Sequence, residues 1–379
     1  MHNDKFLTDK KTRHIEIMDH HVAEQSAGAF HIFGRRWGGV AADNGCQFNI
    51  ADITSCNTRL QVGKVHAATI GASSRAKVAF VADAMAKAAS DLAATVGAKT
   101  ASVEEIIASK DVDAILIATP TGTHADLIEA ASNAGKAILC EKPVSLSVER
   151  ILSCLKVVEK NKSNLMIGFN RRFDPNFANL QARIARGDIG NVELATIISR
   201  DPAPPPADYV RGSGGLFRDM MIHDFDMARF LVGEEFVVVH ALGSALVDKA
   251  IGEAGDVDTA SVQMQTASGK ICVITNSRRA TYGYDQRMEV HGSKGMLRAG
   301  NVHNTTVELA NGDGFKGDPV LNFFTERYGA AYANEVNSFI DGIAKGVSAR
   351  PNGYDGLQAQ KLADAATESW STGKPVKVL

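Results

Sequence analysis

The sequence predicts an α/β protein with a parallel, doubly wound sheet in its first half and an α+β arrangement with a mostly antiparallel sheet in its second half. Between about residues 76 and 169, short apolar runs alternate with helical segments, the order typical of a parallel sheet. After Phe169, strand-like runs follow one another with few helices between them. The length of 379 residues suits two domains better than one compact core.

Expected strands and helices alternate through the first half. The strands are 78–82, 114–118, 137–139 and 165–169, and the helices are 63–70, 85–96, a segment that begins at Ser102, 123–134 and 147–159. The run 114–118 is apolar throughout, as expected for a strand buried on both faces. Ser102 and Glu105 form an S-x-x-E capping box, and Gly135 lies where a helix commonly ends.

The second half contains mostly strands. These are 192–199, 236–243, 260–266, 271–276, 288–290 and 306–309, with helices at 219–231, 322–344 and 354–370. The proline-rich stretch 201–206 predicts a stiff, extended loop. Because an antiparallel sheet can leave one face for another partner, we expect the chain to form a homo-oligomer through that face.

Composition excludes several classes of protein. A formal net charge of −2 with scattered basic residues gives no reason to expect a nucleic-acid or membrane partner. Five cysteines without a C-x-x-C pair favour neither structural zinc nor disulfides, so we expect the reducing cytoplasm. We expect no membrane span, since no run of about 18 apolar residues occurs, and the N-terminus lacks the apolar stretch of a secretory signal.

Residues 1–46 carry several histidines and show no clear hydrophobic period, which predicts a poorly ordered extension. The pair His20-His21 could bind a metal, but no third ligand stands at a suitable spacing. A solvated tail is therefore the favoured interpretation, and we expect no metal site.

A dinucleotide site is indicated by one motif and opposed by another. Asp83 ends the run 78–82, where an acid can accept the ribose hydroxyls of an adenine dinucleotide; a helix-capping role is the alternative. Gly63 is placed as the third glycine of a G-x-G-x-x-G turn, but Thr58 and Leu60 replace the first two. The stretch 52–57 also looks too polar for a central strand. We therefore expect residues 1–62 to lack the first strand and phosphate loop of such a fold, and NAD binding to be weakened.

Two further motifs follow expected strands and so lie at the carboxyl edge of the sheet, where ligands bind in open α/β folds. Thr119, Pro120 and His124 follow the run 114–118, in a loop that could also simply cap the next helix. Glu141 and Lys142 follow the run 137–139. A lysine in this place can donate hydrogen bonds to a substrate hydroxyl and to a developing oxyanion, although most lysines are solvated surface groups.

Asp219 and His223 are spaced i, i+4, which would place them on one face of a helix. A neutral imidazole is a suitable base for a hydroxyl proton, and a nearby carboxylate can fix its tautomer. A metal pair without a third ligand and a plain helix are the competing interpretations, and spacing alone favours the plain helix.

Taken in order, these motifs resemble the glucose–fructose oxidoreductase/inositol dehydrogenase/rhizopine catabolism (Gfo/Idh/MocA) family, and most of all its inositol 2-dehydrogenase branch. The resemblance covers about residues 62–379. The matching segments are Gly63–His66, Asp83, Ala118–Thr121 with His124, Glu141–Pro143, Gly168–Asp174, Gly214–Asp226 and Tyr282–Asp285. The region before Gly63 departs from the family pattern. An altered reading frame or wrong start in the gene model would explain this departure, as would a true variant with impaired cofactor binding.

The resemblance implies a Rossmann domain at 47–169 and a substrate-binding and oligomerisation domain at 170–379. It also implies that the second domain has an open-faced sheet and that the chain forms a dimer or a tetramer. It implies NAD-dependent oxidation of a cyclic polyol, myo-inositol to 2-keto-myo-inositol (scyllo-inosose). In that family Lys142 contacts the reacting hydroxyl, Asp219 is the orienting acid and His223 is the base. The implied substrate ligands are Asn170, Arg171, Asp226 and Tyr282. The implied NAD ligands are Gly63, Lys64, Val65, Asp83, Thr119, Pro120, His124, Glu141 and Lys142. A sugar-binding sensor without catalysis and a glucose-type dehydrogenase are the alternatives.

Overall fold

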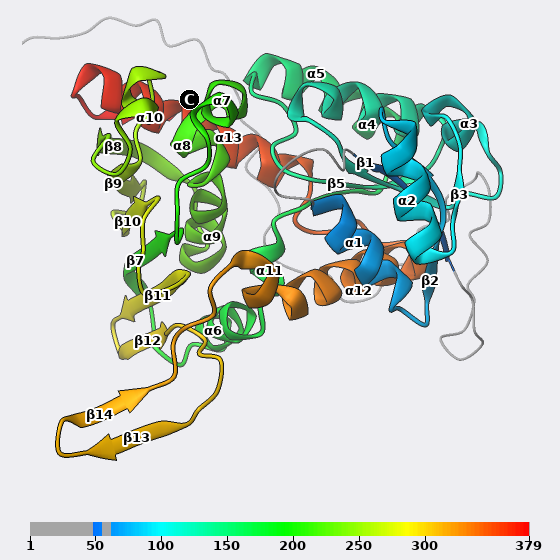
Figure 1. Cartoon of the computed structure of the whole chain (residues 1–379). Helices are drawn as coiled ribbons and strands as arrows, with labels where there is room; N and C mark the ends of the chain where they lie inside the picture. Colours follow the sequence, from blue (N-terminus) through cyan, green and yellow to red (C-terminus); the bar gives the residue numbers. More distant parts are fainter. Residues whose placement is uncertain (1–47, 55–61, 379) are drawn as a thin grey trace, which may run out of the picture. The chain divides into compact units, whose positions relative to one another are not determined.

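The computed structural model describes residues 48–54 and 62–378, which form two large sheets, a small hairpin and the helices packed around them (Figure 1). The expected extension at 1–46 and the turn containing Thr58 and Leu60 lie outside the described residues.

The first sheet is parallel and has six strands in the order β3-β2-β1-β4-β5-β6. Its strands are β1 Phe48–Thr54, β2 Ala76–Ala82, β3 Lys99–Thr100, β4 Ala114–Ala118, β5 Ala137–Cys140 and β6 Leu165–Ile167. This 3-2-1-4-5-6 order is the doubly wound arrangement that binds dinucleotides at its switch point, between the first and fourth strands. The predicted parallel sheet is confirmed.

The expectation that residues 1–62 contain no first strand is wrong. β1 lies at the centre of the sheet and pairs with both β2 and β4. Ile50, Ala51 and Ile53 are buried and supply the apolar contacts that a central strand needs. Asp52 is fully buried beside them, and burial, together with the nearby Asp83, raises its pKa well above the ordinary value. The sheet therefore accommodates the polar stretch by favouring a neutral carboxyl group.

Helices cover both faces of the first sheet. They are α1 Val62–Gly71, α2 Ala86–Val96, α3 Val103–Ala108, α4 His124–Asn133 and α5 Val148–Asn161, with a 3-10 turn η1 at Thr121–Thr123. Side chains of α1 and α2 pack on one face, and those of α3, α4 and α5 pack on the other. The Ser102–Glu105 capping box is confirmed, and Gly135 follows α4 with a φ of 71°.

The second sheet has seven strands in the order β12-β11-β7-β10-β9-β8-β15. They are β7 Val192–Arg200, β8 Phe236–Ser244, β9 Thr259–Thr266, β10 Ile271–Ser277, β11 Asp285–Gly292, β12 Gly295–Ala299 and β15 Val376–Lys377. Only the β7–β10 pairing is parallel, so the predicted, mostly antiparallel sheet is confirmed. β13 Glu308–Asn311 and β14 Gly314–Gly317 form a separate hairpin, shifted from the strand expected at 306–309.

The second sheet is covered on one face by helices. The helices of this half are η2 Asn170–Phe173, α6 Pro175–Ala185, α7 Ala207–Ser213, α8 Gly215–Asp219, α9 Ile222–Val232, α10 Lys249–Glu253, α11 Phe324–Arg327, α12 Gly329–Lys345 and α13 Gly353–Thr372. Residues of α6, α9 and α13 share a core with the buried side chains of the sheet. Helix α12 also packs against the first sheet, through Phe339 and Ile340. The segments predicted as single helices at 219–231 and 322–344 are each interrupted.

Candidate active site

The predicted catalytic residues meet in a cavity of about 240 Å³. It is lined by the segment that follows β5, by η2, by the proline-rich loop 201–206 and by α9, among other elements. Lys142, Asp219 and His223 all line it, as do Asn170 and Arg171. A larger hollow of about 850 Å³ lies between α6 and residues 297–308, but none of the predicted catalytic residues lines it. The chemistry therefore belongs to the smaller cavity.

Lys142 and Asp219 hold each other in place. Lys142 Nζ donates to the Asp219 backbone oxygen at 2.8 Å and to its Oδ1 at 3.3 Å. Tyr209 donates its hydroxyl to Oδ1 at 3.0 Å, and Arg278 Nη2 donates to Oδ2 at 3.2 Å. Burial alone would raise the pKa of Asp219, but the Lys142 and Arg278 cations lower it below its ordinary value. Asp219 is thus an ionised anchor that fixes the lysine over the cavity.

Asp219 and His223 do not share one helix, so this expectation is wrong. Asp219 ends α8, Met220 and Met221 interrupt the helix, and His223 lies in α9. In a continuous helix the Asp219 carbonyl would accept the His223 N–H; here it accepts Lys142 Nζ. The two side chains still reach the same cavity. Within the described part of the chain, the Asp219 carboxylate is bonded to Lys142, Tyr209 and Arg278 rather than to the imidazole.

His223 is partly buried and suited to accept a proton. Burial lowers its pKa well below the ordinary value, and the Lys142 and Arg171 cations lower it further. The imidazole is therefore neutral at neutral pH. Its ring meets the Phe169 ring edge-on, with centroids 6.1 Å apart, and its Nδ1 has no hydrogen-bond partner among the described residues. A neutral imidazole beside a fixed ammonium group can take a proton from a hydroxyl that the ammonium group binds.

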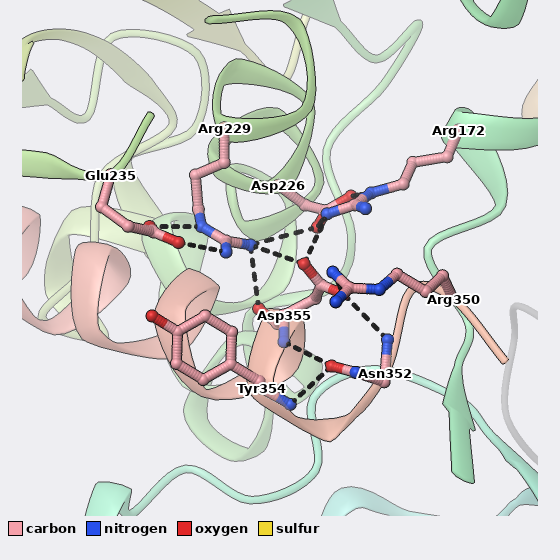
Figure 2. Close-up of polar contacts among 8 residues, drawn as sticks. All are labelled: Arg172, Asp226, Arg229, Glu235, Arg350, Asn352, Tyr354 and Asp355. Carbon is pink, nitrogen blue, oxygen red and sulfur yellow. Dashed lines mark hydrogen bonds and ion pairs between the residues drawn. The ribbon is translucent and has the colours of Figure 1, made fainter. Parts of the chain in front are cut away.

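Two of the four predicted substrate ligands lie at the cavity and two do not. Asn170 and Arg171 line it, and Arg171 Nη1 donates to Ser199 Oγ at 3.1 Å. Asp226 lies outside the lining and forms ion pairs with Arg172 and Arg229 (Figure 2). Tyr282 is also outside it, with 52% of its surface exposed and its hydroxyl donating to Asp285 at 2.6 Å. The side chains of Asp226 and Tyr282 bind other residues, so neither of them lines the cavity.

The structure adds lining residues that sequence reasoning missed, among them Tyr209, Arg278, Tyr284 and Asp201. Burial raises the pKa of Asp201 to about 6, partly offset by Arg278 and Arg171. These residues come from separate elements with no local motif. The signals in the sequence were the proline-rich stretch 201–206, which includes Asp201, and the family segment Tyr282–Asp285, which includes Tyr284.

Gly63 is required by the packing of α1 against β1. A Cβ atom at this position would lie 1.7 Å from Thr54 Oγ1. This is the close helix–strand approach that the third glycine of a dinucleotide turn permits. Lys64 and Val65 follow in the same helix, with Lys64 exposed and Val65 partly buried. Asp83 follows β2, and its Oδ1 accepts the Met85 N–H at 2.8 Å. The sheet order, the glycine and the acid together fit an adenine dinucleotide.

The remaining predicted cofactor residues form the loops at the carboxyl edge of the first sheet. Thr119 Oγ1 lies 2.7 Å from Thr123 Oγ1, beside Pro120. The His124 ring nitrogens lie 2.8 Å from the Pro143 oxygen and 2.7 Å from the Thr119 oxygen. Both nitrogens are therefore engaged with the backbone, and His124 joins two loops.

Glu141 lies on the same edge and lines the cavity. Its Oε1 lies 2.7 Å from Nε2 of the buried His66, in α1. This contact ties the segment that carries Lys142 to the helix that begins beside Gly63.

Comparisons with known proteins give family matches for both halves of the chain. Residues 60–169 match the model of an oxidoreductase family with an NAD-binding Rossmann fold, and residues 177–298 match the GFO/IDH/MocA C-terminal domain. The chain is 54% identical to inositol 2-dehydrogenase of Rhizobium meliloti (strain 1021) over 318 residues, 84% of this chain and 96% of the relative. It is 48% identical to myo-inositol 2-dehydrogenase of Thermotoga maritima over 274 residues, 72% of this chain and 82% of the relative.

A solved structure with bound ligands has a similar fold. Scyllo-inositol dehydrogenase from Lactobacillus casei, with bound NAD(H) and scyllo-inositol, superposes with a TM-score of 0.81 at 30% identity. The match covers 88% of this chain and 99% of that one. Within residues 48–54 and 62–378, no helix combines the length and the apolar character needed to cross a membrane.

Proposed function

Because this chain belongs to the Gfo/Idh/MocA family of NAD-binding oxidoreductases, we propose that it oxidises myo-inositol to 2-keto-myo-inositol, with NAD as the hydride acceptor. The observation that carries the proposal is the convergence of Lys142, Asp219 and His223 in one cavity that is also lined by Asn170 and Arg171. The relatives named inositol 2-dehydrogenase supply the substrate class. A role in inositol catabolism in the cytoplasm follows, and the unpaired Cys140, Cys154 and Cys272 are consistent with a reducing compartment.

The proposal gives each catalytic residue a role. Lys142 donates a hydrogen bond to the oxygen of the reacting hydroxyl, since its ammonium group is fixed by Asp219 at the wall of the cavity. His223 accepts the hydroxyl proton on its neutral ring. Asp219 positions the lysine, and through Tyr209 and Arg278 it also fixes neighbouring parts of the wall. NAD, when bound, would accept the hydride from the substrate carbon that bears the reacting hydroxyl.

The proposed NAD-binding residues surround the carboxyl edge of the first sheet. Gly63, Lys64 and Val65 lie at the start of α1, where backbone N–H groups can meet a pyrophosphate. Asp83 would accept the ribose hydroxyls. Thr119 and Pro120 would flank the nicotinamide half, beside Glu141 and Lys142, and His124 would act by holding their loops together.

The test combines a polyol panel with one substitution. NADH formation is measured with myo-inositol, scyllo-inositol and glucose, with NAD and with NADP. We expect an inositol with NAD to be the preferred pair. His223→Ala should lower turnover by about 10²–10⁴, the usual contribution of a general base. Turnover of glucose alone would favour a glucose-type dehydrogenase, and near-wild-type turnover in His223→Ala would refute the role of this histidine.

A sensor that binds sugar without catalysis is not favoured. Its motivation is Thr58 and Leu60 in the expected phosphate loop, which lie outside the described residues. The similarity to inositol 2-dehydrogenases supports an enzyme instead. Polyol binding by a chain that binds no NAD would nevertheless revive it.

We also propose that the chain forms a homo-oligomer through the outer face of the second sheet. The face opposite the helices carries side chains of the two central strands, β7 and β10. Leu194 and Ile271 pair across these strands and are 40% and 41% exposed. On β8, which β9 separates from β10, Leu242 is 63% exposed. Apolar side chains gathered on one sheet face favour burial against a second sheet.

A further inference from the structure

We propose that Arg172 and Asp226 are positioning residues, whose buried ion pair holds the start of α9 against η2 and so sets the place of His223 in the cavity. The inference rests on the proposed function for the role of His223. It assigns Asp226 a different task from that of a substrate ligand.

The pair is bidentate and buried. Arg172 Nε donates to Asp226 Oδ2 at 2.7 Å, and Nη2 donates to Oδ1 at 2.6 Å. The two side chains are 10% and 1% exposed. Each carboxylate oxygen thus has a guanidinium donor, and the fork matches the carboxylate plane. Such a contact fixes orientation as well as distance. The Arg172 guanidinium also lies 4.8 Å from the centroid of the Phe230 ring, which is in α9.

Both residues of the pair lie close in sequence to residues that line the cavity. Arg172 is the residue after Arg171, which lines the cavity, and Asp226 lies one helical turn after His223. A second ion pair, between Arg171 and Asp224, joins the same two elements. Consecutive arginines of η2 are therefore bound to two aspartates of α9 that follow His223. A shift of either partner would move the backbone that carries the imidazole.

A third segment anchors this contact from outside the cavity. Asp355 Oδ1 accepts Arg172 Nη2 at 3.0 Å and Arg229 Nη1 at 3.2 Å (Figure 2). Asp355 also forms a capping box with Asn352 at the start of α13. The buried cluster of Arg172, Asp226, Arg229 and Asp355 contains two cations and two anions. Its charges are balanced, and it joins η2, α9 and α13.

Stability alone is a weak reason for such a cluster. Buried ion pairs lose much of their Coulombic gain to desolvation, and apolar residues of similar shape are often equally stable. An apolar contact cannot fix the orientation of a side chain as a pair of hydrogen bonds does. Because catalytic groups must be held within about 0.5 Å of a productive geometry, a bidentate pair one turn from the base is suited to that task.

The experiment uses the full-length enzyme and separates turnover from substrate binding. Asp226→Asn and Arg172→Lys should lower kcat by up to about 10²-fold, the effect of misplacing a reacting group by about 1 Å, with KM for myo-inositol close to the wild-type value. Glu235→Gln, which breaks only the outer Arg229–Glu235 pair, is the matched control and should keep the wild-type kcat.

A double variant separates positioning from stability. Arg172→Met/Asp226→Leu replaces the pair with apolar groups of similar shape, so its melting temperature should recover relative to Asp226→Asn while kcat stays low. A raised KM with unchanged kcat in Asp226→Asn would overturn the inference in favour of a substrate contact. Recovery of kcat in the double variant would overturn it in favour of simple packing.

A spectroscopic readout keeps this inference distinct from the proposed function. The ¹H–¹⁵N signal of the His223 ring, assigned with His223→Gln, should shift in Asp226→Asn and not in Glu235→Gln. If the wild-type chain oxidises no polyol, the proposed function fails while the positioning effect is still measured. An unchanged His223 signal in Asp226→Asn would overturn the positioning role whatever the activity.

Discussion

At the scale of single residues, the chemistry depends on protonation states that burial and neighbouring ions set. Burial and two cations keep His223 neutral, while the same lysine keeps Asp219 ionised. The site therefore holds a free base next to a fixed ammonium group at neutral pH. Asp201 is the exception, because burial raises its pKa to about 6, closer to neutral pH than an ordinary aspartate.

Asp201 should set the acid limb of the pH profile. Its carboxylate lines the cavity and can accept hydrogen bonds from polyol hydroxyls once it is ionised. Because its pKa is raised to about 6, kcat/KM should be level near pH 7 and should fall as the pH drops through 6. Asp201→Asn should remove this inflection, leaving only the fall due to protonation of His223 at lower pH. An inflection near pH 6 that persists in Asp201→Asn would contradict the assignment.

At the scale of elements, β1 shows that packing can override an unfavourable sequence. Its register with β2 and β4 buries Asp52 completely, although neither carboxyl oxygen has a hydrogen-bond partner among the described residues. The strand forms because its apolar neighbours complete both layers of helix packing, and the buried acid lowers stability without preventing the fold.

Replacing this acid should stabilise the protein. Asp52→Val should raise the free energy of unfolding at pH 7 by about 1–3 kcal/mol, the cost of an unsatisfied buried polar group. The folded-state pKa is raised, so wild-type stability is lost as the pH rises above the unfolded pKa of about 3.9. The advantage of the valine should therefore shrink toward pH 4 in urea titrations.

Asp52→Asn is the matched control for that measurement. It keeps a buried polar group but removes the titration, so it should flatten the pH dependence with a smaller gain in stability. Equal stability of wild type and Asp52→Val at pH 7 would contradict this account of β1.

At the scale of the whole molecule, two sheets divide the work. The first supplies the carboxyl edge from which Lys142 projects, and the helices of the second half bring His223 to the same cavity. The second sheet keeps an outer face with exposed apolar side chains, which the first sheet lacks because helices cover both of its faces.

Charges on that outer face should dissociate the proposed oligomer. Leu194→Lys/Ile271→Lys places two cations across the paired central strands, where burial against a second sheet would desolvate them. Sedimentation velocity should show a smaller species than wild type, with an unchanged far-UV circular dichroism spectrum. Leu309→Lys, in the β13–β14 hairpin and 57% exposed, should keep the wild-type size. A wild-type sedimentation coefficient for the double variant would exclude this face.

The sequence by itself determined most of the order of strands and helices from residue 76 onward, because hydrophobic period and helix caps are local properties, but it did not reveal the polar first strand, β1. It also indicated Lys142 at a strand end and Gly63 at the start of a helix, since both positions are fixed by their immediate neighbours. Only the tertiary structure decided which side chains meet. The partner of Asp219 is Lys142, 77 residues away, rather than His223 at i+4, and Asp226 is bound to Arg172, 54 residues away. Buried charges pair with whichever opposite charges the fold brings near them. The spacing of residues in the sequence does not predict such long-range partners.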